Sequence, residues 1–388
     1  MRLLNVSVVY PPAPRHGGTP ITSHEAAKAV AALGHEVLSI ATGDAKRDGT
    51  PVVDNHTIYD GMPAIYCSRL PCPLPFFSPS LGREVAEHLP DFDVASIRSS
   101  WTLVGPMASA RCRERHTPYI GYPEGNLDPW ALRRSFLRKR AFWRLFDRDY
   151  FRGASAIVAL TTSEADSIRR MGLSNRVEVI PNGVRLEDLD GAMARRDLDS
   201  VFPSLHGRRV VLFMGRLHPK KGLPLLLGAF RRVRDEVTDA VLAVAGADET
   251  GHLREVRARV RALGLTEDVA FLGHVSGETK KTLLHHAEAF VLPSYSEGLP
   301  VAVLEAMGCG TPVVVSEQCH LPEVREVGAG IVTDLSEEAV GLAIRALLRD
   351  DEMRRQMGMS ARRLVVERFT WGRVGRMTAA LASEVAAG

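Results

Sequence analysis

The sequence of 388 residues has only five cysteines, too few and too irregularly spaced for the usual cysteine-based structures. No two of them form a CxxC pair, and their spacing fits no zinc site. Their odd number also argues against the disulfide framework of a small secreted domain. We therefore expect a cytoplasmic protein.

Charge of one sign and long apolar runs are also missing. The chain has 49 Lys and Arg residues against 46 Asp and Glu residues, so its net charge of +3 is too small for a protein that must neutralise a nucleic-acid backbone. No stretch reaches the roughly 18 apolar residues of a transmembrane helix. The N-terminus has only a short apolar run that ends at prolines, which predicts a buried strand and its loop rather than a signal peptide.

What the chain does have is a regular alternation of short apolar runs, rich in β-branched residues, with helical patterns. A first series runs from residues 3–9 to 176–184, and a second opens at 208–217 with strands about 25 residues apart. A polar stretch at 185–207 separates them. This alternation is typical of parallel sheets with crossover helices. We predict two Rossmann-like, doubly wound domains that face a central cleft, with ligands at the carboxyl ends of their strands.

The block PSYSEGLPVAVLEAMGCGTPVVVSE, which starts at Pro293, combines a strand end, a loop and a helix start with two carboxylates. Proline is favourable in a first helical turn, so we expect the helix to begin near Pro300. The backbone N–H groups there would attract an anion such as phosphate. Glu297 would lie beside that anion, and Glu305 about 7 Å along the helix. The alternative is that both glutamates are ordinary solvated residues.

The block GRLHPKKGLPLLLGAF, which starts at Gly215, follows a predicted strand and leads into a predicted helix. Arg216 and Lys221 therefore stand where strand ends point into the predicted cleft. Two cations at a helix start can hold a diphosphate, because arginine supplies a planar fork and lysine a point charge. Lys220 is better explained as a solvated surface charge.

With these motifs the sequence resembles the retaining glycosyltransferases of the GT-B fold in the large group 1 (family four) set. The likeness covers nearly the whole chain, through HGGTPITSHEAAKAVAALGHEV, TTSEADSIRR, VIPNGV, GRLHPKKG, the two-glutamate block and LPEVREVGAGIV. It implies an acceptor-side domain of residues 1–190 and a donor domain of residues 191–370. The terminal VVERFTWGRV resembles the segment that crosses back, so residues 371–388 would complete the first domain.

The resemblance also implies roles for single residues. Arg216 and Lys221 would bind the donor diphosphate, Glu297 the transferred sugar and Glu305 the ribose. The other donor contacts that it implies are Gly17 and Gly18 in a first-domain loop, Val275 after the strand FLGH, and Gly298, Leu299 and Pro300 beside Glu297. A residue without a side chain lets the backbone approach a phosphate closely, although a glycine pair can equally mark an ordinary tight turn.

The acceptor side departs from the family pattern. Many relatives place a histidine in the first-domain loop that corresponds here to GYPEGNLDPW, and this chain has Glu124 at that place. Asn126 is uncharged and cannot act as a general base, while Asp128 is suited to capping the next helix. Glu124 and Asn126 are therefore the acceptor-side candidates.

Apparent metal motifs lack the right context. Asp91 and Asp93 imitate the DxD of the other major glycosyltransferase fold, but they precede a predicted buried strand. His285 and His286 are adjacent and so face different sides of a helix. We therefore predict no metal and no cofactor.

The expected function is transfer of a sugar from a UDP- or GDP-sugar to an acceptor, with retention of configuration, in polysaccharide, glycolipid or glycoconjugate biosynthesis. Retention follows from the resemblance, because no residue identifies itself as a nucleophile. Two alternatives stay open: a nucleotide-sugar epimerase, and a catalytically silent sugar-nucleotide binding module. A dehydrogenase is disfavoured because the chain lacks a glycine fingerprint.

The segment from residue 130 to 152 concentrates positive charge, with eight basic residues against two aspartates. Phe136, Trp143, Phe146 and Tyr150 recur at helical spacing, which predicts an amphipathic helix. The simpler interpretation is that this apolar stripe packs on the first domain while the charges are solvated. The alternative is peripheral contact with an anionic membrane, or with a lipid-linked acceptor, at the inner face of the membrane.

Overall fold

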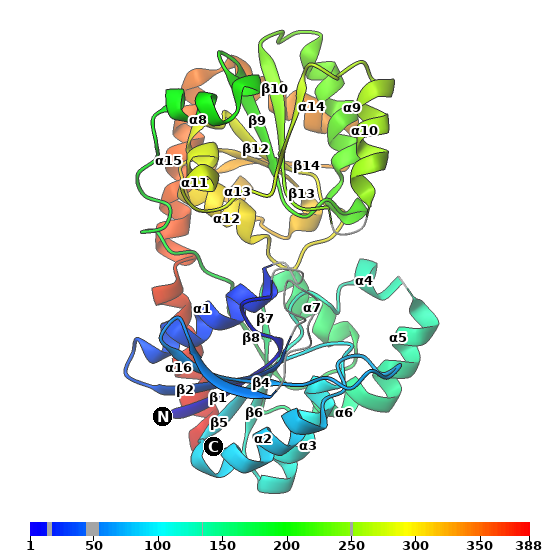
Figure 1. Ribbon diagram of the computed structural model, residues 1–388, viewed down its shortest axis with the longest axis vertical. Coiled ribbons are helices and arrows are strands. Elements are labelled where there is room, and N and C mark those ends of the chain that lie inside the picture. The colour runs from blue at the N-terminus through cyan, green and yellow to red at the C-terminus, as the bar shows by residue number, and fades with distance from the viewer. Residues whose placement is uncertain (14–17, 44–53, 134, 249–250) are drawn as a thin grey trace. The chain divides into compact units, whose positions relative to one another are not determined.

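The computed structural model describes residues 1–13, 18–43, 54–133, 135–248 and 251–388 (Figure 1). The chain divides into two compact units. Unit 1 comprises Met1–Gly183 together with Trp371–Gly388, and unit 2 comprises Val184–Thr370. Each unit is an α/β structure built on one largely parallel sheet, which confirms the predicted fold class.

The sheet of unit 1 has eight strands in the order β3-β4-β2-β1-β5-β6-β7-β8. Only the β3–β4 pair is antiparallel among these pairings. The strands are β1 (Arg2–Val9), β2 (Glu36–Thr42), β3 (Asn55–Tyr59), β4 (Met62–Cys67), β5 (Val94–Arg98), β6 (Tyr119–Tyr122), β7 (Ala156–Ala159) and β8 (Arg176–Val179). The α-helices are α1 (Thr19–Ala31), α2 (Pro79–His88), α3 (Val104–Arg115), α4 (Pro129–Arg133), α5 (Phe136–Phe142), α6 (Arg148–Arg152), α7 (Thr162–Arg170) and α16 (Trp371–Ala387).

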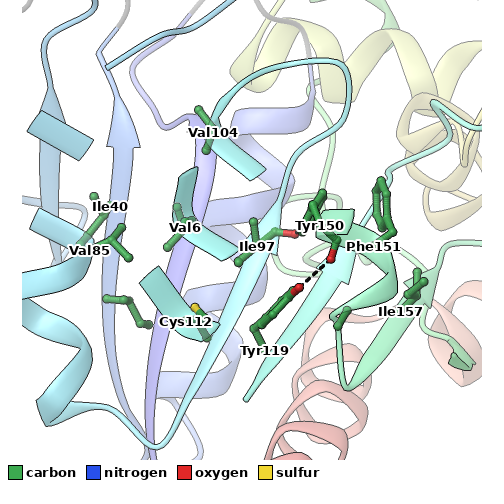
Figure 2. Packing of buried hydrophobic residues seen from close by; sticks show 14 of the residues in the cluster. Val6, Ile40, Val85, Ile97, Val104, Cys112, Tyr119, Tyr150, Phe151 and Ile157 are labelled. Carbon is green, nitrogen blue, oxygen red and sulfur yellow. Dashed lines mark hydrogen bonds between the residues drawn. The ribbon is translucent and has the colours of Figure 1, made fainter. Parts of the chain in front are cut away.

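Both faces of this sheet are covered, so its central strands are largely buried on both sides. One core cluster brings Val6 and Ile97 of neighbouring strands together with Phe151, and Figure 2 shows this packing. Tyr119 and Tyr150 are fully buried there, yet each hydroxyl donates to a main-chain carbonyl, at 2.6 and 2.7 Å. Burial of these rings therefore leaves no unpaired hydroxyl.

The last helix belongs to unit 1. Trp371, Val374 and Leu381 of α16 join Leu3 and Val30 in the second core cluster, and α16 packs along α1 (Figure 1). The final segment thus completes the core on the other face of the sheet, with about 1.5–3 kcal/mol gained for each large apolar side chain that it buries.

The sheet of unit 2 has six parallel strands in the order β11-β10-β9-β12-β13-β14. The strands are β9 (Arg209–Met214), β10 (Ala240–Ala245), β11 (Val269–Gly273), β12 (Ala289–Leu292), β13 (Val313–Ser316) and β14 (Gly330–Thr333). The helices are α8 (Arg195–Val201), α9 (Leu223–Arg234), α10 (His252–Ala262), α11 (Gly277–His286), α12 (Val301–Gly308), α13 (Glu323–Glu326), α14 (Glu337–Arg349) and α15 (Asp351–Arg368). Every residue of β10 is buried, as expected for a central parallel strand.

Each sheet changes direction at one point. In unit 2 the chain builds β10 and β11 on one side of β9, then crosses to build β12, β13 and β14 on the other. In unit 1 the same reversal lies between β1 and β5. At such a switch point the loops after the two central strands part, and this opens a crevice at their carboxyl ends. The topology therefore marks one candidate binding place in each unit.

The basic segment differs from its prediction. Instead of one amphipathic helix, it forms α4, α5, a π-helical turn (Trp143–Asp147) and α6. Tyr150 is fully buried, whereas Phe136 is 54% exposed. The predicted apolar stripe is therefore interrupted, because the π turn adds a residue to one turn of the helix and shifts the face that the later residues present.

Candidate functional site

The first part of the candidate site is the connection between β9 and α9. His218 accepts a hydrogen bond from the Lys220 main-chain N–H, at 3.0 Å, and so begins a short 3-10 turn. That turn ends at Gly222, whose φ is +70°. A Cβ on Gly222 would lie 2.0 Å from the Pro293 carbonyl oxygen, so only glycine fits there. This close approach places Lys221 against the connection between β12 and α12.

The second part is that β12–α12 connection, which holds Glu297. Its Oε1 lies 2.7 Å from Lys221 Nζ and accepts a hydrogen bond from Ser294 Oγ at 2.6 Å. The main chain ties the two connections as well, since the Tyr295 N–H donates to the Lys220 carbonyl at 2.8 Å. The structure thus brings together Lys221 and Glu297, which lie 76 positions apart in the chain.

Glu297 is held as an anion. Its side chain is only 8% exposed, and burial alone would raise its pKa. The ammonium groups of Lys221 and Lys220, with the hydrogen bonds from Lys221 and Ser294, outweigh that effect and lower the pKa of Glu297. An ionised carboxylate accepts hydrogen bonds only, which suits it to bind hydroxyl groups.

The third part is the start of α12, which begins at Val301 with Pro300 as its N-cap, as predicted. The first hydrogen bond of the helix runs from the Val303 N–H to the Pro300 carbonyl. The N–H groups of Val301 and Ala302 precede that turn, and with the helix dipole they form a place for an anion. Leu299, the residue before Pro300, is buried and fixes the entry to the helix.

Glu305 has a partner that sequence reasoning missed. It lies in the second turn of α12, and its Oε1 is 2.6 Å from Lys280 Nζ on α11. Nothing in the local sequence indicates this pair, because Lys280 comes 25 positions earlier and on another helix. Glu305 is therefore neither a purely solvated surface residue nor part of the Lys221 pair.

The remaining predicted donor residues are more spread out. Arg216 is exposed at the exit of β9, and Val275 is half-buried after β11, at the edge of the sheet. Gly298 is half-buried beside Glu297. Gly18 is the N-cap of α1 in unit 1, while Gly17 lies outside the described residues.

Unit 1 has a pocket of about 330 Å³ at its own switch point, lined by the end of β1, the end of β5 with the loop after it, the loop after β6 and the start of α1. Glu124 and Asn126 both line it. Arg98, the last residue of β5, donates to Glu124 Oε1 at 3.1 Å and stacks over the ring of Tyr122 at 4.0 Å. A charge at the end of an otherwise uncharged strand was the signal that could have singled out Arg98.

The two acceptor-side candidates differ in setting. The Glu124 side chain is 12% exposed and its backbone has a φ of +54°. Burial raises the pKa of Glu124, and the guanidinium of Arg98 opposes that effect. Asn126 is exposed, and its side-chain amide donates to the Pro123 carbonyl at 3.1 Å.

Two groups of acidic residues that resemble metal sites have hydrogen-bonding or ionic partners within unit 1. Asp93 accepts a hydrogen bond from the Arg2 N–H, at 2.6 Å, and so joins the start of β1 to the start of β5. Among the described residues, His24, Glu25 and Asp60 lie close enough to share an ion. Lys28 Nζ already lies 2.6 Å from Asp60 Oδ2, so that carboxylate has a cation of its own.

Comparison with known families gives two matches that together span most of the chain. Residues 195–364 match the model described as "Glycosyl transferases group 1", and residues 16–188 match "Glycosyltransferase Family 4". The chain belongs to the group 1 glycosyltransferases of the GT-B fold. The predicted resemblance to the group 1 family and to the GT-B fold is confirmed.

Curated relatives are about 30% identical to this chain over the aligned residues. The α-maltose-1-phosphate synthase of Mycolicibacterium smegmatis is 29% identical over 62% of this chain and 66% of its own length. The D-inositol 3-phosphate glycosyltransferase of Salinispora arenicola is 34% identical over 57% and 52%. The phosphatidyl-myo-inositol mannosyltransferase of Mycobacterium leprae is 32% identical over 51% and 50%. The chain thus spans one half to two thirds of the length of these relatives.

Solved structures support the fold. The sucrose-phosphate synthase of Thermosynechococcus elongatus has a TM-score of 0.79 at 18% identity, with 100% of this chain and 99% of that chain covered. HepE of Anabaena, solved in complex with UDP and glucose, has a TM-score of 0.77 at 18% identity, with 99% and 100% covered. At this level of identity the likeness shows the fold alone.

Proposed function

We propose that this chain is a glycosyltransferase that moves a sugar from a UDP- or GDP-sugar to an acceptor hydroxyl, with retention of anomeric configuration. The observation that carries the proposal is the cluster of Lys221, Ser294 and Glu297 beside the start of α12. One relative is named as GDP-mannose-dependent, and HepE was solved with UDP, which supports these two donor bases. The acceptor would belong to polysaccharide, glycolipid or glycoconjugate biosynthesis.

The donor diphosphate binds across the switch point of unit 2. As the bond between the anomeric carbon and the phosphate oxygen breaks, negative charge grows on the leaving nucleoside diphosphate. The ammonium of Lys221 and the N-terminus of α12 are fixed beforehand beside that charge, and such preorganised groups stabilise a transition state. Arg216, at the exit of β9, adds a planar fork for the phosphate oxygens.

When the donor is bound, Lys221 has two partners, Glu297 and a phosphate oxygen. An ammonium carries three N–H donors, so Lys221 can keep Glu297 in place with one of them and bind a phosphate oxygen with another. Glu297, ionised and oriented by Ser294, accepts hydrogen bonds from the hydroxyls of the transferred sugar. The sugar is thereby oriented against a fixed diphosphate.

Glu305 binds the ribose. Lys280 holds its Oε1, which leaves the second oxygen to accept hydrogen bonds from the ribose hydroxyls. Val275 is proposed to contact the nucleobase through its backbone, and Gly17 and Gly18 to approach the phosphates. This arrangement separates recognition of the nucleotide from recognition of the sugar.

The acceptor binds in the pocket of unit 1. A sugar or a lipid-linked acceptor presents hydroxyl groups, and the pocket offers the Arg98–Glu124 pair together with Ser100 and Asn126. Such a mixture of charged, amide and hydroxyl groups suits a polyhydroxylated ligand. No metal and no cofactor is needed, because Lys221, Arg216 and the helix N-terminus supply the positive charge.

The test is incubation of the purified chain with UDP-, GDP- and ADP-sugars and a panel of sugar and lipid-linked acceptors. We expect consumption of one donor only when an acceptor is present, with no effect of a chelator. Glu297→Ala should abolish turnover, and the control Glu278→Ala, on an exposed residue of the same unit, should not. A donor epimerised without acceptor, binding without turnover, or strict dependence on divalent metal would each contradict the proposal.

A further inference from the structure

The surface of α5 and the π turn after it exposes large apolar side chains. Leu137 is 79% exposed, Leu145 70% and Phe136 54%. These three lie within ten residues of one another in the sequence. Single exposed apolar residues are common on protein surfaces, but a local group of them marks a surface that contacts something.

The other side of the same segment does pack on the core of unit 1, so lack of a core does not explain why these three side chains are exposed. The opposite side of the same segment carries Phe142 and Trp143, whose rings pack against Trp101 at centroid distances of 6.5 and 6.2 Å. Trp143 also stacks on the buried Phe151, at 6.0 Å. The inward face is therefore already filled with aromatic rings, and the outward apolar residues need a different explanation.

The segment also makes two contacts with Trp101, in the loop after β5. Asp147, which is fully buried, accepts a hydrogen bond from the Trp101 main-chain N–H at 2.8 Å. Lys139 lies over the Trp101 ring, 5.2 Å from its centroid. Both contacts fix the segment to the loop after β5, so its outward face is a defined surface.

That outward face is strongly basic. Arg138, Arg140 and Arg144 are exposed, and the sequence has no acidic residue from position 129 to 146. Residues three positions apart share a face of a helix, so Arg140 lies beside Leu137 in α5. Arg144 and Leu145 are neighbours in the π turn, and both are exposed. Arginines beside protruding leucines thus define a surface that we call the Arg-Leu face, formed by residues 136–145.

We propose that the Arg-Leu face docks on the surface of an anionic phospholipid membrane. The guanidinium groups would bind lipid phosphates, while Leu137, Leu145 and Phe136 would enter the boundary between headgroups and acyl chains. A soluble polyanion would use the arginines alone and leave the leucines without a function. Among the described residues, no helix has the length and apolarity to cross a bilayer, and peripheral docking needs none.

The experiment is co-sedimentation of the full chain with vesicles of phosphatidylcholine alone, and of phosphatidylcholine with phosphatidylglycerol, at low and high salt. Three variants are compared with the parent. The first is Arg138→Gln with Arg140→Gln and Arg144→Gln, and the second is Leu137→Ser with Leu145→Ser. The control is Arg115→Gln with Arg169→Gln and Arg376→Gln, which removes the same charge from exposed positions elsewhere in unit 1.

We expect the parent to bind the anionic vesicles at low salt and to be released by high salt. The first variant should bind about 100-fold more weakly, since each surface cation contributes about 1 kcal/mol. The leucine variant should also bind the anionic vesicles more weakly at low salt, and the control should bind them like the parent. Circular dichroism of each variant verifies that it is folded.

Three results would overturn the proposal. Absence of binding to anionic vesicles at low salt would remove the membrane as partner. Equal losses in the first variant and the control would show that net charge alone matters. Unchanged binding of the leucine variant, together with binding of heparin by the parent, would assign the face to a soluble polyanion.

Discussion

The two switch points of this chain share a topology but shift the pKa of a carboxyl group in opposite directions. In unit 2, Glu297 has two lysines and a serine around it, and its pKa is lowered. In unit 1, burial dominates at Glu124 and its pKa is raised, although Arg98 lies 3.1 Å away. The same fold therefore supplies a fixed anion in one unit and a carboxyl with a raised pKa in the other.

This difference fits two different tasks. A site that stabilises a growing negative charge needs cations that stay charged, with their counter-ions arranged in advance. A site that binds neutral hydroxyl groups needs a polar side chain. One partner, such as Arg98 for Glu124, is enough to offset the cost of burying that side chain. Replacing residues in each unit should therefore affect different steps of the reaction.

The largest effect is expected from removal of the cations of unit 2. Lys221→Ala and Arg216→Ala should each lower kcat by roughly 100-fold to 1000-fold, the usual loss when a donor to developing charge is removed. Steady-state kinetics with saturating acceptor measures this. Arg232→Ala, at an exposed position of α9, is the control and should retain most of the rate. Near-normal turnover in either main variant would make that cation an ordinary surface charge.

The two glutamates of unit 2 should separate sugar from nucleotide. Glu297→Ala should reduce turnover far more than it weakens binding of the free nucleoside diphosphate, because Glu297 is assigned to the sugar. Glu305→Ala should weaken binding of the free nucleotide itself, by roughly 10-fold, the loss of about 1.4 kcal/mol. Calorimetric titration with nucleoside diphosphate and sugar nucleotide measures both.

Lys280→Ala supplies the control for Glu305, because Lys280 holds that carboxylate at 2.6 Å. It should reproduce part of the Glu305→Ala loss in nucleotide affinity and leave the sugar-dependent step unchanged. If Glu297→Ala and Glu305→Ala each weakened binding of the nucleoside diphosphate and of the sugar nucleotide equally, the assignment of Glu297 to the sugar and of Glu305 to the ribose would be wrong.

In unit 1 the expected effect is on the acceptor and on stability. Glu124→Gln should raise KM for the acceptor by roughly 10-fold and leave donor affinity unchanged. Arg98→Ala should destabilise the fold by about 3 kcal/mol, because it leaves a buried carboxyl without its partner. Acceptor kinetics and chemical denaturation measure the two. A change in donor affinity with either variant would contradict the assignment of this pocket.

The smallest effect concerns Asp147, another carboxyl of unit 1 whose pKa is raised. Burial raises the pKa of Asp147 to about 7, against the hydrogen bond from Trp101. The unfolded chain ionises near pH 4, so the cost of burying the charge grows as the pH rises from about 4 to 7 and is complete above 7. Asp147→Asn should therefore raise Tm at pH 8 by about 3 °C.

The advantage of Asp147→Asn should shrink toward pH 5, where the native carboxyl is already neutral. Thermal unfolding at pH 5 and pH 8 measures the difference. Asp149→Asn, two residues away and exposed, is the control and should show no such dependence on pH. A gain of equal size at both pH values would show that ionisation of Asp147 is not its cause.

The sequence predicted the parts of the fold and of the site that depend on local order along the chain. The alternation of strands and helices determined the α/β class, and the glycine and proline positions around Lys221 and Pro300 located the two connections of unit 2. Both connections follow central strands, so their meeting at the switch point followed from topology.

The parts that the sequence did not predict depend on packing between distant segments. Lys280 reaches Glu305 only because α11 packs beside α12, and Arg98 reaches Glu124 only because β5 and β6 are neighbours. The π turn at Trp143–Asp147 likewise shifts the outward face of the basic segment. Helical periodicity assumes a regular helix, so it placed Phe136 and Tyr150 on one apolar stripe, whereas Phe136 is 54% exposed and Tyr150 is fully buried.

The central claim is that the switch point of unit 2 binds the diphosphate of a sugar nucleotide. The most direct measurement is a crystal structure of the chain soaked with UDP or GDP. We predict a phosphate oxygen within hydrogen-bonding distance of Lys221 Nζ and of the first N–H groups of α12, with Glu305 at the ribose. A diphosphate bound elsewhere, with the Lys221–Glu297 pair left untouched, would contradict the account.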